Sequence, residues 1–429
     1  MSSHPLLDEL HWRGLLYQRT EHLAAALSAG PVTGYAGFDP TAPSLHVGNL
    51  VPVMGLMHLQ RHGHRPVVLV GGGTGLIGDP SGKSAERPLS SPDVIAANAA
   101  AIRDQLSRFV DFEGAHAARM RDNAEWLTKL GAIEFMRDVG KHFTVNYMMQ
   151  KDSVKSRLEA GISYTEFSYM LLQAYDFLEL HRRDGVTLQL GGSDQWGNIT
   201  AGIELIRRVA GVEAHALTLP LVTTASGAKF GKSEAGAVWL DPSLTSPYRF
   251  YQFWINTDDR DVGRYLRFFT LLPHDEVVAL DRALAEHPEQ REAQRALARE
   301  MTRRLHGDAA LRGAEEVSAF YFGGLDPASL SGEAFAQLRT DAPFADVQLA
   351  DVAGEADGQL DVFKLLTAAG IAASNGAARR LLEQGGVSVN KRKLGASERF
   401  IDVATSLLTG RHVILGKGKR EYALLRVQG

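Results

Sequence analysis

Residues Phe38–Gly73 read FDPTAPSLHVGNLVPVMGLMHLQRHGHRPVVLVGGG, and their order of turn, helix and strand decides the predicted fold. The turn is followed by apolar residues at helical spacing, which predict a helix over Leu45–His62. The apolar run Arg65–Val70 ends in glycines and predicts a short buried strand. His46 and Gly48 stand at the start of the helix, where free backbone N–H groups favour an anion such as a nucleotide phosphate. An ordinary capped helix with an incidental histidine explains these residues equally well.

The same order of strand, loop and helix recurs through residues 30–215. Ser91–Phe112 is predicted to be helical, with a proline in its first turn behind a serine cap. A strand over Thr187–Leu190 ends in two glycines and leads into a helix over Asn198–Val209. This alternation predicts an α/β fold with a Rossmann-like, doubly wound parallel sheet. Ligands of such sheets bind beyond the carboxyl ends of the strands, so the loops after these strands are the expected site.

The chain of 429 residues is long enough for two or three domains, and its charge is unevenly distributed. Residues 361–429 hold 12 Lys/Arg against 5 Asp/Glu, a net charge of +7, whereas the first 360 hold 34 against 45, a net of −11. A polyanion is the expected partner of the basic end, although a merely soluble basic domain is an alternative. We predict a catalytic domain over 1–225, a mobile loop over 226–245, an α-helical domain over 246–322, a linker over 323–360 and a small α+β domain over 361–429.

Composition excludes several classes of protein. The chain has no cysteine, which rules out a disulfide framework, thiol catalysis and a zinc–thiolate site. Its content of 45% apolar and 22% charged residues is that of a globular protein. Since the sequence has neither an apolar run of membrane-spanning length nor a signal-peptide pattern, we expect a cytoplasmic protein without a membrane partner.

The glycine-rich segment after Val70 resembles two nucleotide motifs and satisfies neither. Gly73–Gly78 has the spacing of a dinucleotide fingerprint, but no helix follows it. The spacing also fails for a Walker loop, because the required earlier glycine falls on Ile77. What remains is a glycine loop at a strand end that carries the charges of Asp79, Lys83 and Arg87.

Three polar residues share one face of a predicted helix over Ser163–Phe177. Tyr169, Gln173 and Asp176 stand at positions i, i+4 and i+7. A phenol, an amide and a carboxylate on one face can recognise an ammonium and a hydroxyl together. A solvated face is the alternative, but such faces usually carry Lys and Glu.

Two further segments carry polar groups suited to a nucleotide. Asp194 and Gln195 stand at a helix start and suit ribose or amide contacts, although capping alone explains Asp194. Lys229 and Lys232 flank a glycine in a flexible stretch. Such a mobile cationic loop can stabilise charge that develops on phosphates in a transition state, whereas taken alone it would be a surface loop.

Together these motifs resemble those of class I aminoacyl-tRNA synthetases. His46–Asn49 resembles their HIGH signature, with Asn49 in place of the second histidine, and Lys229–Ser233 resembles their KMSKS loop. The helix over Tyr164–Phe177 and the segment Gly191–Asn198 are similar to those of bacterial tyrosyl-tRNA synthetases, in order along nearly the whole chain. Residues 362–428 resemble a small RNA-binding module shared with a small-subunit ribosomal protein.

The resemblance implies that the protein activates L-tyrosine with ATP, releases diphosphate and transfers the tyrosyl group to the 3′ end of tRNA(Tyr). ATP with Mg²⁺ would be a substrate complex, with no tightly bound cofactor and no metal site in the protein. The resemblance also implies a homodimer. Two rivals remain: a nucleotidyltransferase of the same fold that does not use tRNA, and an RNA-binding protein with a degenerate nucleotide fold.

The resemblance also implies residue roles. Tyr35 and Asp176 would bind the phenolic hydroxyl of tyrosine. The tyrosine site as a whole would comprise Tyr35, Asp79, Tyr169, Gln173, Asp176, Gln189 and Gln195. The ATP site would comprise Gly37, Asp39, His46, Gly48, Asn49, Lys83, Arg87, Gly192, Asp194, Lys229, Lys232 and Ser233. Catalysis would rest on Thr41, His46, Lys229 and Lys232 at the phosphates.

Overall fold

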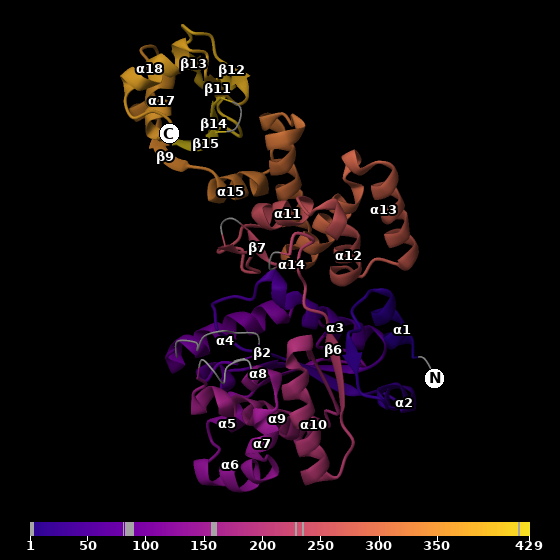
Figure 1. Ribbon diagram of the computed structural model, residues 1–429. Coiled ribbons are helices and arrows are strands. Elements are labelled where there is room, and N and C mark those ends of the chain that lie inside the picture. Colours follow the sequence, from indigo (N-terminus) through magenta and orange to yellow (C-terminus); the bar gives the residue numbers. More distant parts are fainter. Residues whose placement is uncertain are drawn as a thin grey trace. The chain divides into compact units, whose positions relative to one another are not determined.

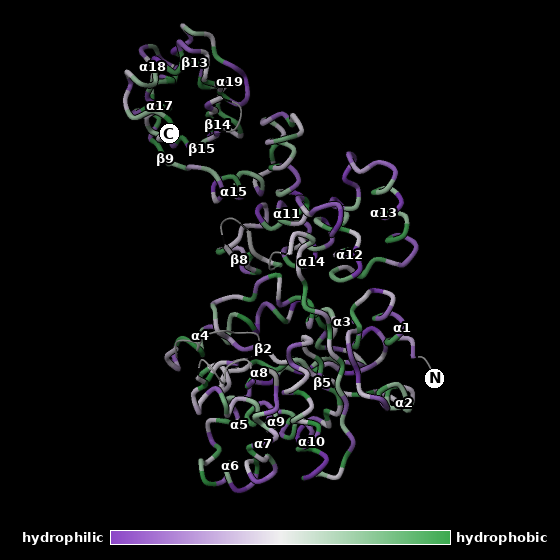
Figure 2. The backbone as a smooth tube through the Cα atoms, viewed as in Figure 1, coloured by the Kyte–Doolittle hydropathy of each residue, from purple (hydrophilic) through white to green (hydrophobic). Residues whose placement is uncertain are grey.

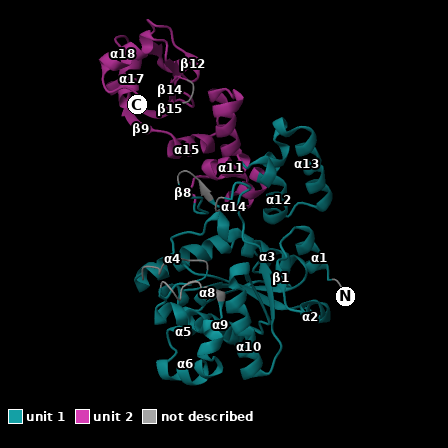
Figure 3. Ribbon diagram, in the orientation of Figure 1, with its two compact units in different colours: residues 1–241, 257–297 teal, residues 242–256, 298–429 magenta. Residues whose placement is uncertain are grey.

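The computed structural model describes residues 4–79, 81, 90–155, 161–227, 230–233, 236–418 and 421–429. The chain forms two units (Figure 3). The first unit comprises residues 1–241 and 257–297, and the second comprises residues 242–256 and 298–429.

Within the described residues, a six-stranded sheet forms the centre of the first unit (Figure 1). The edge strand β1 runs antiparallel to β6, and all the other neighbours are parallel. The chain passes from β2 to β3 and β4 on one side, and then returns to place β5 on the other side of β2. This reversal confirms the predicted Rossmann-like fold and marks the end of β2 and β5 as the ligand-binding edge. In spatial order the strands are β1 (Gln18–Arg19), β6 (His215–Leu219), β5 (Leu188–Gly192), β2 (Thr33–Phe38), β3 (Arg65–Val70) and β4 (Arg119–Asp122).

Local capping sets the bounds of the helices of this unit. The longest of those that belong to it entirely, α9 (Tyr164–Asp184), begins after Ser163, whose hydroxyl accepts the N–H of Glu166, and ends at Gly185 with φ 66°. The predicted helix at Ser91–Phe112 is confirmed as α4 (Pro92–Leu106) and ends six residues early. The other helices are α1 (Pro5–Trp12), α2 (Leu23–Ala29), α3 (Leu50–Arg61), α5 (Ala124–Leu127), α6 (Ala132–Asp138), α7 (Val145–Met149), α8 (Asp152–Lys155), α10 (Trp196–Ala210), α12 (Asp259–Phe269) and α13 (His274–Glu286).

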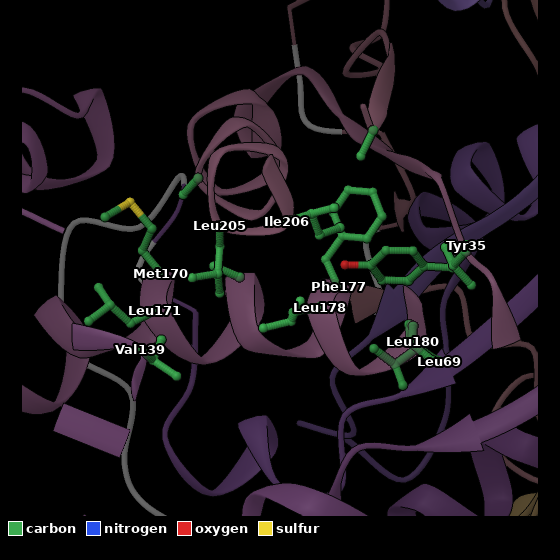
Figure 4. Close-up of a cluster of buried hydrophobic side chains, with 14 of the residues drawn as sticks. Tyr35, Leu69, Val139, Met170, Leu171, Phe177, Leu178, Leu180, Leu205 and Ile206 are labelled. Carbon is green, nitrogen blue, oxygen red and sulfur yellow. The ribbon is translucent and has the colours of Figure 1, made fainter. Parts of the chain in front are cut away.

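A buried apolar cluster joins this sheet to α9 and α10 (Figure 4). Phe177 and Leu180 of α9 pack with Leu205 of α10 and with Tyr35 of β2. The two helices approach closely at Gly202, where a Cβ would come within 2.8 Å of the Phe177 ring. The core thereby fixes the face of α9 that carries the predicted polar residues. Along α13, by contrast, hydrophobic and hydrophilic residues alternate, as expected for an outer helix (Figure 2).

The second unit contains a five-stranded sheet, counted within its described residues, and a set of helices. Residues 323–360, predicted to be a linker, contain α15 (Gly332–Asp341), β9 (Phe344–Gln348) and α16 (Leu349–Val352). Because β9 pairs in parallel with β15, this segment belongs to the C-terminal fold, and its low content of large apolar residues was a poor guide. The strands of the sheet lie in the order β12 (Arg392–Lys393), β11 (Val387–Val389), β14 (His412–Lys417), β15 (Glu421–Gln428) and β9. The other elements of this unit are α11 (Pro247–Ile255), β10 (Gln359–Asp361), α17 (Val362–Ala368), α18 (Asn375–Glu383), β13 (Phe400–Asp402) and α19 (Val403–Ser406).

Residues 246–322 are helical as predicted, but their helices are divided between the two units. α12 and α13 belong to the first unit and α11 to the second. The long helix α14 (Glu292–Ser318) contributes to both and is kinked at Gly307, where φ is 83°. None of the helices formed by the described residues is both long and apolar enough to cross a membrane.

Candidate active site

A cavity of about 310 Å³ lies at the carboxyl ends of β2 and β5, where the strand order reverses. The volume suits a small ligand. The cavity brings together residues that are far apart in the sequence, from the β2 loop, α9 and the β5 loop. The predicted site residues that line it are Tyr35, Gly37, Asp39, Thr41, Gly48, Asn49, Tyr169, Gln173, Asp176, Gln189, Gly192, Asp194 and Gln195.

Asp176 forms the buried end of this cavity. Its side chain accepts hydrogen bonds from Nε1 of Trp126 at 2.7 Å and from Nδ2 of Asn123 at 2.8 Å. Burial raises the pKa of Asp176 to about 8, even though both donors act to lower it. The carboxyl group is therefore held in a fixed orientation, and burial favours its uncharged, protonated form.

Sequence reasoning missed Asn123 and Trp126. They follow β4, which has only four residues, Arg119–Asp122, and lacks the apolar run that marked the other strands. The available signal was their place in the chain, because residues that follow a parallel strand reach the same edge of the sheet.

Tyr35 carries an unused hydroxyl group beside Asp176. The side chain is 1% exposed, and its ring lies against Phe177 with 5.2 Å between ring centroids (Figure 4). Within the described part of the chain, the Tyr35 hydroxyl has no hydrogen-bond partner and is not reached by solvent. Burial raises the pKa of Tyr35, and the nearby charge of Asp176 raises it further. The neighbouring residue on β5, Gln189, has a buried Oε1 that also lacks a partner among the described residues.

A chain of amides and one carboxylate forms the wall beside α9. Nε2 of Gln173 donates to Oε1 of Gln195 at 3.2 Å, and Nε2 of Gln195 donates to Oδ2 of Asp79 at 2.7 Å. Asn198, which sequence reasoning also missed, donates from Nδ2 to Oε1 of Gln173 at 3.0 Å. Asp79 is not among the residues that line the cavity, and it acts on the cavity through Gln195.

Asp39 connects two walls of the cavity. Its Oδ2 accepts the hydroxyl of Tyr169 at 2.8 Å, and its Oδ1 accepts that of Thr74 at 2.7 Å. Tyr169 stands on α9, whereas Thr74 belongs to the glycine loop after β3. Across the cavity, burial raises the pKa of Asp194, and the charge of Asp79 adds to this effect.

The His46–Asn49 segment is capped by its own side chains. Nδ1 of His46 accepts the N–H of Gly48 at 3.0 Å, and the N–H of His46 donates to Oδ1 of Asn49 at 3.0 Å. A Cβ at Gly48 would come within 2.8 Å of the His46 ring, so the glycine is required by the histidine itself. This corrects the expectation that the N–H groups at this turn are free for an anion. Gly48 and Asn49 line the cavity, but His46 is not among the lining residues.

The structure describes only some of the cationic residues that were predicted to bind phosphates. Lys83, Arg87 and Lys229 lie outside the described residues. The backbone of Lys232 and Ser233 forms β7 (Lys232–Ser233), which pairs with β8 (Gly236–Ala237). Their roles at the phosphates therefore stay predictions.

Comparison with known proteins finds two family models that match this chain. The family described as tRNA synthetases class I (W and Y) matches residues 27–323, and the family described as Tyrosine--tRNA ligase SYY-like C-terminal domain matches residues 339–425. The chain is 54% identical to a tyrosine–tRNA ligase of Anaeromyxobacter dehalogenans, with 99% of each chain covered. It is 50% identical to the tyrosine–tRNA ligase of Geobacillus stearothermophilus, covering 98% of this chain and 99% of that one.

A solved structure shares the fold of the larger part. The mitochondrial tyrosyl-tRNA synthetase of Aspergillus nidulans, truncated at its C-terminus, superposes with a TM-score of 0.66 at 31% identity. The match covers 72% of this chain and 92% of that structure.

Proposed function

The chain belongs to the tyrosine–tRNA ligases of the class I tRNA synthetases (W and Y), and we infer from this premise that it joins L-tyrosine to tRNA(Tyr) at the expense of ATP. In the first step a carboxylate oxygen of tyrosine attacks the α-phosphorus of ATP. The bond from that phosphorus to the bridging oxygen breaks, diphosphate leaves, and tyrosyl-adenylate remains. In the second step a hydroxyl of the terminal adenosine of tRNA attacks the tyrosyl carbonyl carbon and AMP leaves.

Tyr35 and Asp176 bind the phenolic hydroxyl of the substrate. The observation that carries this role is the buried Tyr35 hydroxyl, which lacks a partner among the described residues and belongs to a residue that lines the same cavity as Asp176. A substrate hydroxyl donates to the carboxyl group of Asp176 and accepts from Tyr35, whereas phenylalanine leaves the Tyr35 hydroxyl unpaired and gives Asp176 no hydrogen bond beyond those from Asn123 and Trp126. Loss of such pairing underlies strong rejection of phenylalanine, for which tyrosyl-tRNA synthetase is itself the standard example, at about 10⁵-fold.

The opposite end of the tyrosine binds to the polar wall beside α9. An ammonium group needs acceptors, and the wall offers the Tyr169 hydroxyl and the amide oxygens of Gln173 and Gln195. The Asp79 carboxylate, bonded to Gln195, adds negative charge behind them. Gln189 supplies a further amide oxygen without a partner among the described residues. With the ammonium group bound there, the carboxylate of tyrosine faces the ATP side.

ATP binds along the β2 and β5 loops. Gly37 lines the cavity, and a Cβ there would meet only Leu69, at 3.8 Å, so the residue leaves a flat surface for a planar or sugar group. Asp39, Gly192 and Asp194 complete the adenosine side, while Gly48, Asn49 and Ser233 contribute to the remainder of the ATP site. Mg²⁺ arrives bound to the ATP phosphates as part of the substrate.

Catalysis consists of positioning and charge stabilisation. Thr41 and His46 act at the leaving diphosphate, together with Lys229 and Lys232 and with the phosphate contacts of Lys83 and Arg87. Cations held at phosphate oxygens stabilise the charge that develops as the bridging bond breaks. The tRNA binds through the basic C-terminal residues, which carry a net charge of +7 over 361–429.

The active protein is a homodimer that works in the cytoplasm, where ATP and tRNA are available. Exposed apolar side chains support the dimer, since Ile133 of α6, Val145 of α7 and Tyr164 at the start of α9 are 74%, 64% and 75% exposed. Sedimentation velocity on Ile133→Asp should give monomers if Ile133 lies at the subunit interface. Tyr17→Asp, which changes another exposed residue, should leave the dimer intact, and an unchanged mass for both variants would refute this interface.

Aminoacylation of total tRNA tests the function directly. Tyrosine should be attached to tRNA and phenylalanine should not, and pyrophosphate exchange should depend on tyrosine. Exchange without charging of tRNA would favour a nucleotidyltransferase that does not use tRNA. Absence of both activities would favour an RNA-binding protein.

A further inference from the structure

Helix α12 holds the segment that leads into residues 229–233, which we call the lysine loop. Oδ2 of Asp261 accepts the N–H of Ala225 at 2.8 Å, and Nη2 of Arg264 donates to the carbonyl oxygen of Thr223 at 2.5 Å. Asp261 is buried, and its other carboxylate oxygen accepts from Arg264 at 2.7 Å. Two residues of α12, one helical turn apart, thus hold the chain a few residues before Lys229.

The same helix holds the loop itself through Phe230. The Phe230 side chain is 4% exposed. Its ring lies edge-on to Tyr265, with 4.9 Å between centroids, and is stacked on Phe269 at 5.1 Å. Both partners stand on α12, and they are themselves in edge contact at 5.8 Å. Phe230, which stands between Lys229 and Lys232 in the sequence, is therefore buried against Tyr265 and Phe269. We call this pair of rings the aromatic seat.

The C-terminal end of α12 is itself held by hydrogen bonds from Arg13. Arg13, which is buried, donates to the carbonyl oxygen of Thr270 at 2.9 Å and to that of Leu272 at 2.8 Å, directly beyond the end of α12. Nε of Arg13 also donates to Glu9 at 2.6 Å, so α1 and the end of α12 are joined.

The other side of the loop is held by the segment that contains His46. The N–H of Val238 donates to the carbonyl oxygen of Gly231 at 3.0 Å, and the N–H of Val47 donates to that of Val238 at 3.0 Å. Gly231 has φ +84°, and a Cβ there would lie 3.0 Å from Cγ2 of Val47 and 3.1 Å from the N of Gly48. Only glycine lets the loop lie this close to the Val47–Gly48 backbone.

We propose that the aromatic seat on α12 docks the lysine loop and that Phe230 is a positioning residue for Lys229 and Lys232. The inference rests on the proposed function and deepens it. The lysines stabilise the leaving diphosphate only while the loop is docked, so the rate of adenylate formation depends on the docked fraction. The tyrosine pocket is built from other elements, so tyrosine binding does not depend on Phe230.

Phe230→Ala tests the proposal through the full-length enzyme. The kcat for tyrosine-dependent pyrophosphate exchange should fall by on the order of 100-fold, the effect expected when catalytic groups lose their position. The Kd for tyrosine, measured by equilibrium dialysis, should stay within about 2-fold of wild type. Phe230→Leu should restore part of the rate, and Tyr17→Ala, which removes an exposed aromatic side chain, should have no effect. Trypsin should also cut the variant faster after Lys229 or Lys232.

A double-mutant cycle with Lys232→Ala separates positioning from a merely structural role. If Phe230 acts through Lys232, adding Phe230→Ala to the Lys232→Ala enzyme should lower its kcat for pyrophosphate exchange much less than the same change lowers the kcat of the wild-type enzyme. Full additivity, an unchanged kcat, or a loss of tyrosine affinity equal to the loss of kcat would each overturn the proposal. The proposed function fails separately, if wild-type enzyme shows no tyrosine-dependent exchange at all.

Discussion

Replacement of Tyr35 by phenylalanine should move stability and activity in opposite directions. In the free protein the Tyr35 hydroxyl is buried and unpartnered among the described residues. A buried polar group without a partner costs roughly 1–3 kcal/mol, so Tyr35→Phe should increase the free energy of unfolding by about 1 kcal/mol. The ring, its contact with Phe177 and the surrounding core remain unchanged.

The same change removes a hydrogen bond to the substrate. A neutral hydrogen bond contributes roughly 0.5–1.5 kcal/mol, so kcat/KM for tyrosine should fall by about 2- to 12-fold. The kcat/KM for phenylalanine should hardly change, because phenylalanine never uses this hydroxyl. Urea unfolding without substrate measures the first effect, and pyrophosphate exchange with each amino acid measures the second. A less stable Tyr35→Phe protein, or equal losses with both amino acids, would refute the reasoning.

Two further perturbations concern the same site, and a third concerns the binding of tRNA. Burial raises the pKa of Asp176 to about 8, so between about pH 4, where the unfolded carboxyl titrates, and pH 8 the folded state binds more protons and the free energy of unfolding falls as pH rises. Asp176→Asn should flatten this fall when urea unfolding is compared at pH 5 and pH 8, and an identical pH dependence would count against the buried, protonated carboxyl group. Trp126→Phe removes the Nε1 donor to Asp176, so it should destabilise the protein by roughly 1–3 kcal/mol and raise the KM for tyrosine; unchanged values would mean that the 2.7 Å contact is not made. Raising KCl from about 50 to about 200 mM should raise the KM for tRNA by at least 10-fold and leave pyrophosphate exchange nearly constant, whereas a salt-independent KM would exclude phosphate contacts as the main tRNA interaction.

Two of the six strands of the sheet, β3 and β5, and most of the residues that line the cavity could be predicted because their signals are local. The helical spacing of Tyr169, Gln173 and Asp176 was enough to predict one shared face, and all three line the cavity. The apolar run at Arg65–Val70 gave β3 with its bounds unchanged. Where a segment owes its structure to its own pattern, the sequence is a sufficient guide.

The residues that were missed owe their roles to distant partners. Asn123 and Trp126 act only because β4 aligns with β3 and delivers them to Asp176, 50 or more positions later in the chain. The expectation of free N–H groups at His46 was wrong because of a local contact, since Nδ1 of the His46 ring accepts the N–H of Gly48. A spacing rule contains neither the strand register nor the rotamer that decides such cases.

The pairing of β9 with β15 has a consequence for synthesis of the protein. β15 lies between β14 and β9, and 72 residues separate Gln348 from Glu421. At about 5–20 residues per second, the ribosome needs roughly 4–15 s to make that interval, during which β9 has no strand to pair with. Throughout that time the nascent C-terminal fold presents an open strand edge and an unfinished core, which makes it a substrate for chaperones and the stage at which premature termination would be most damaging.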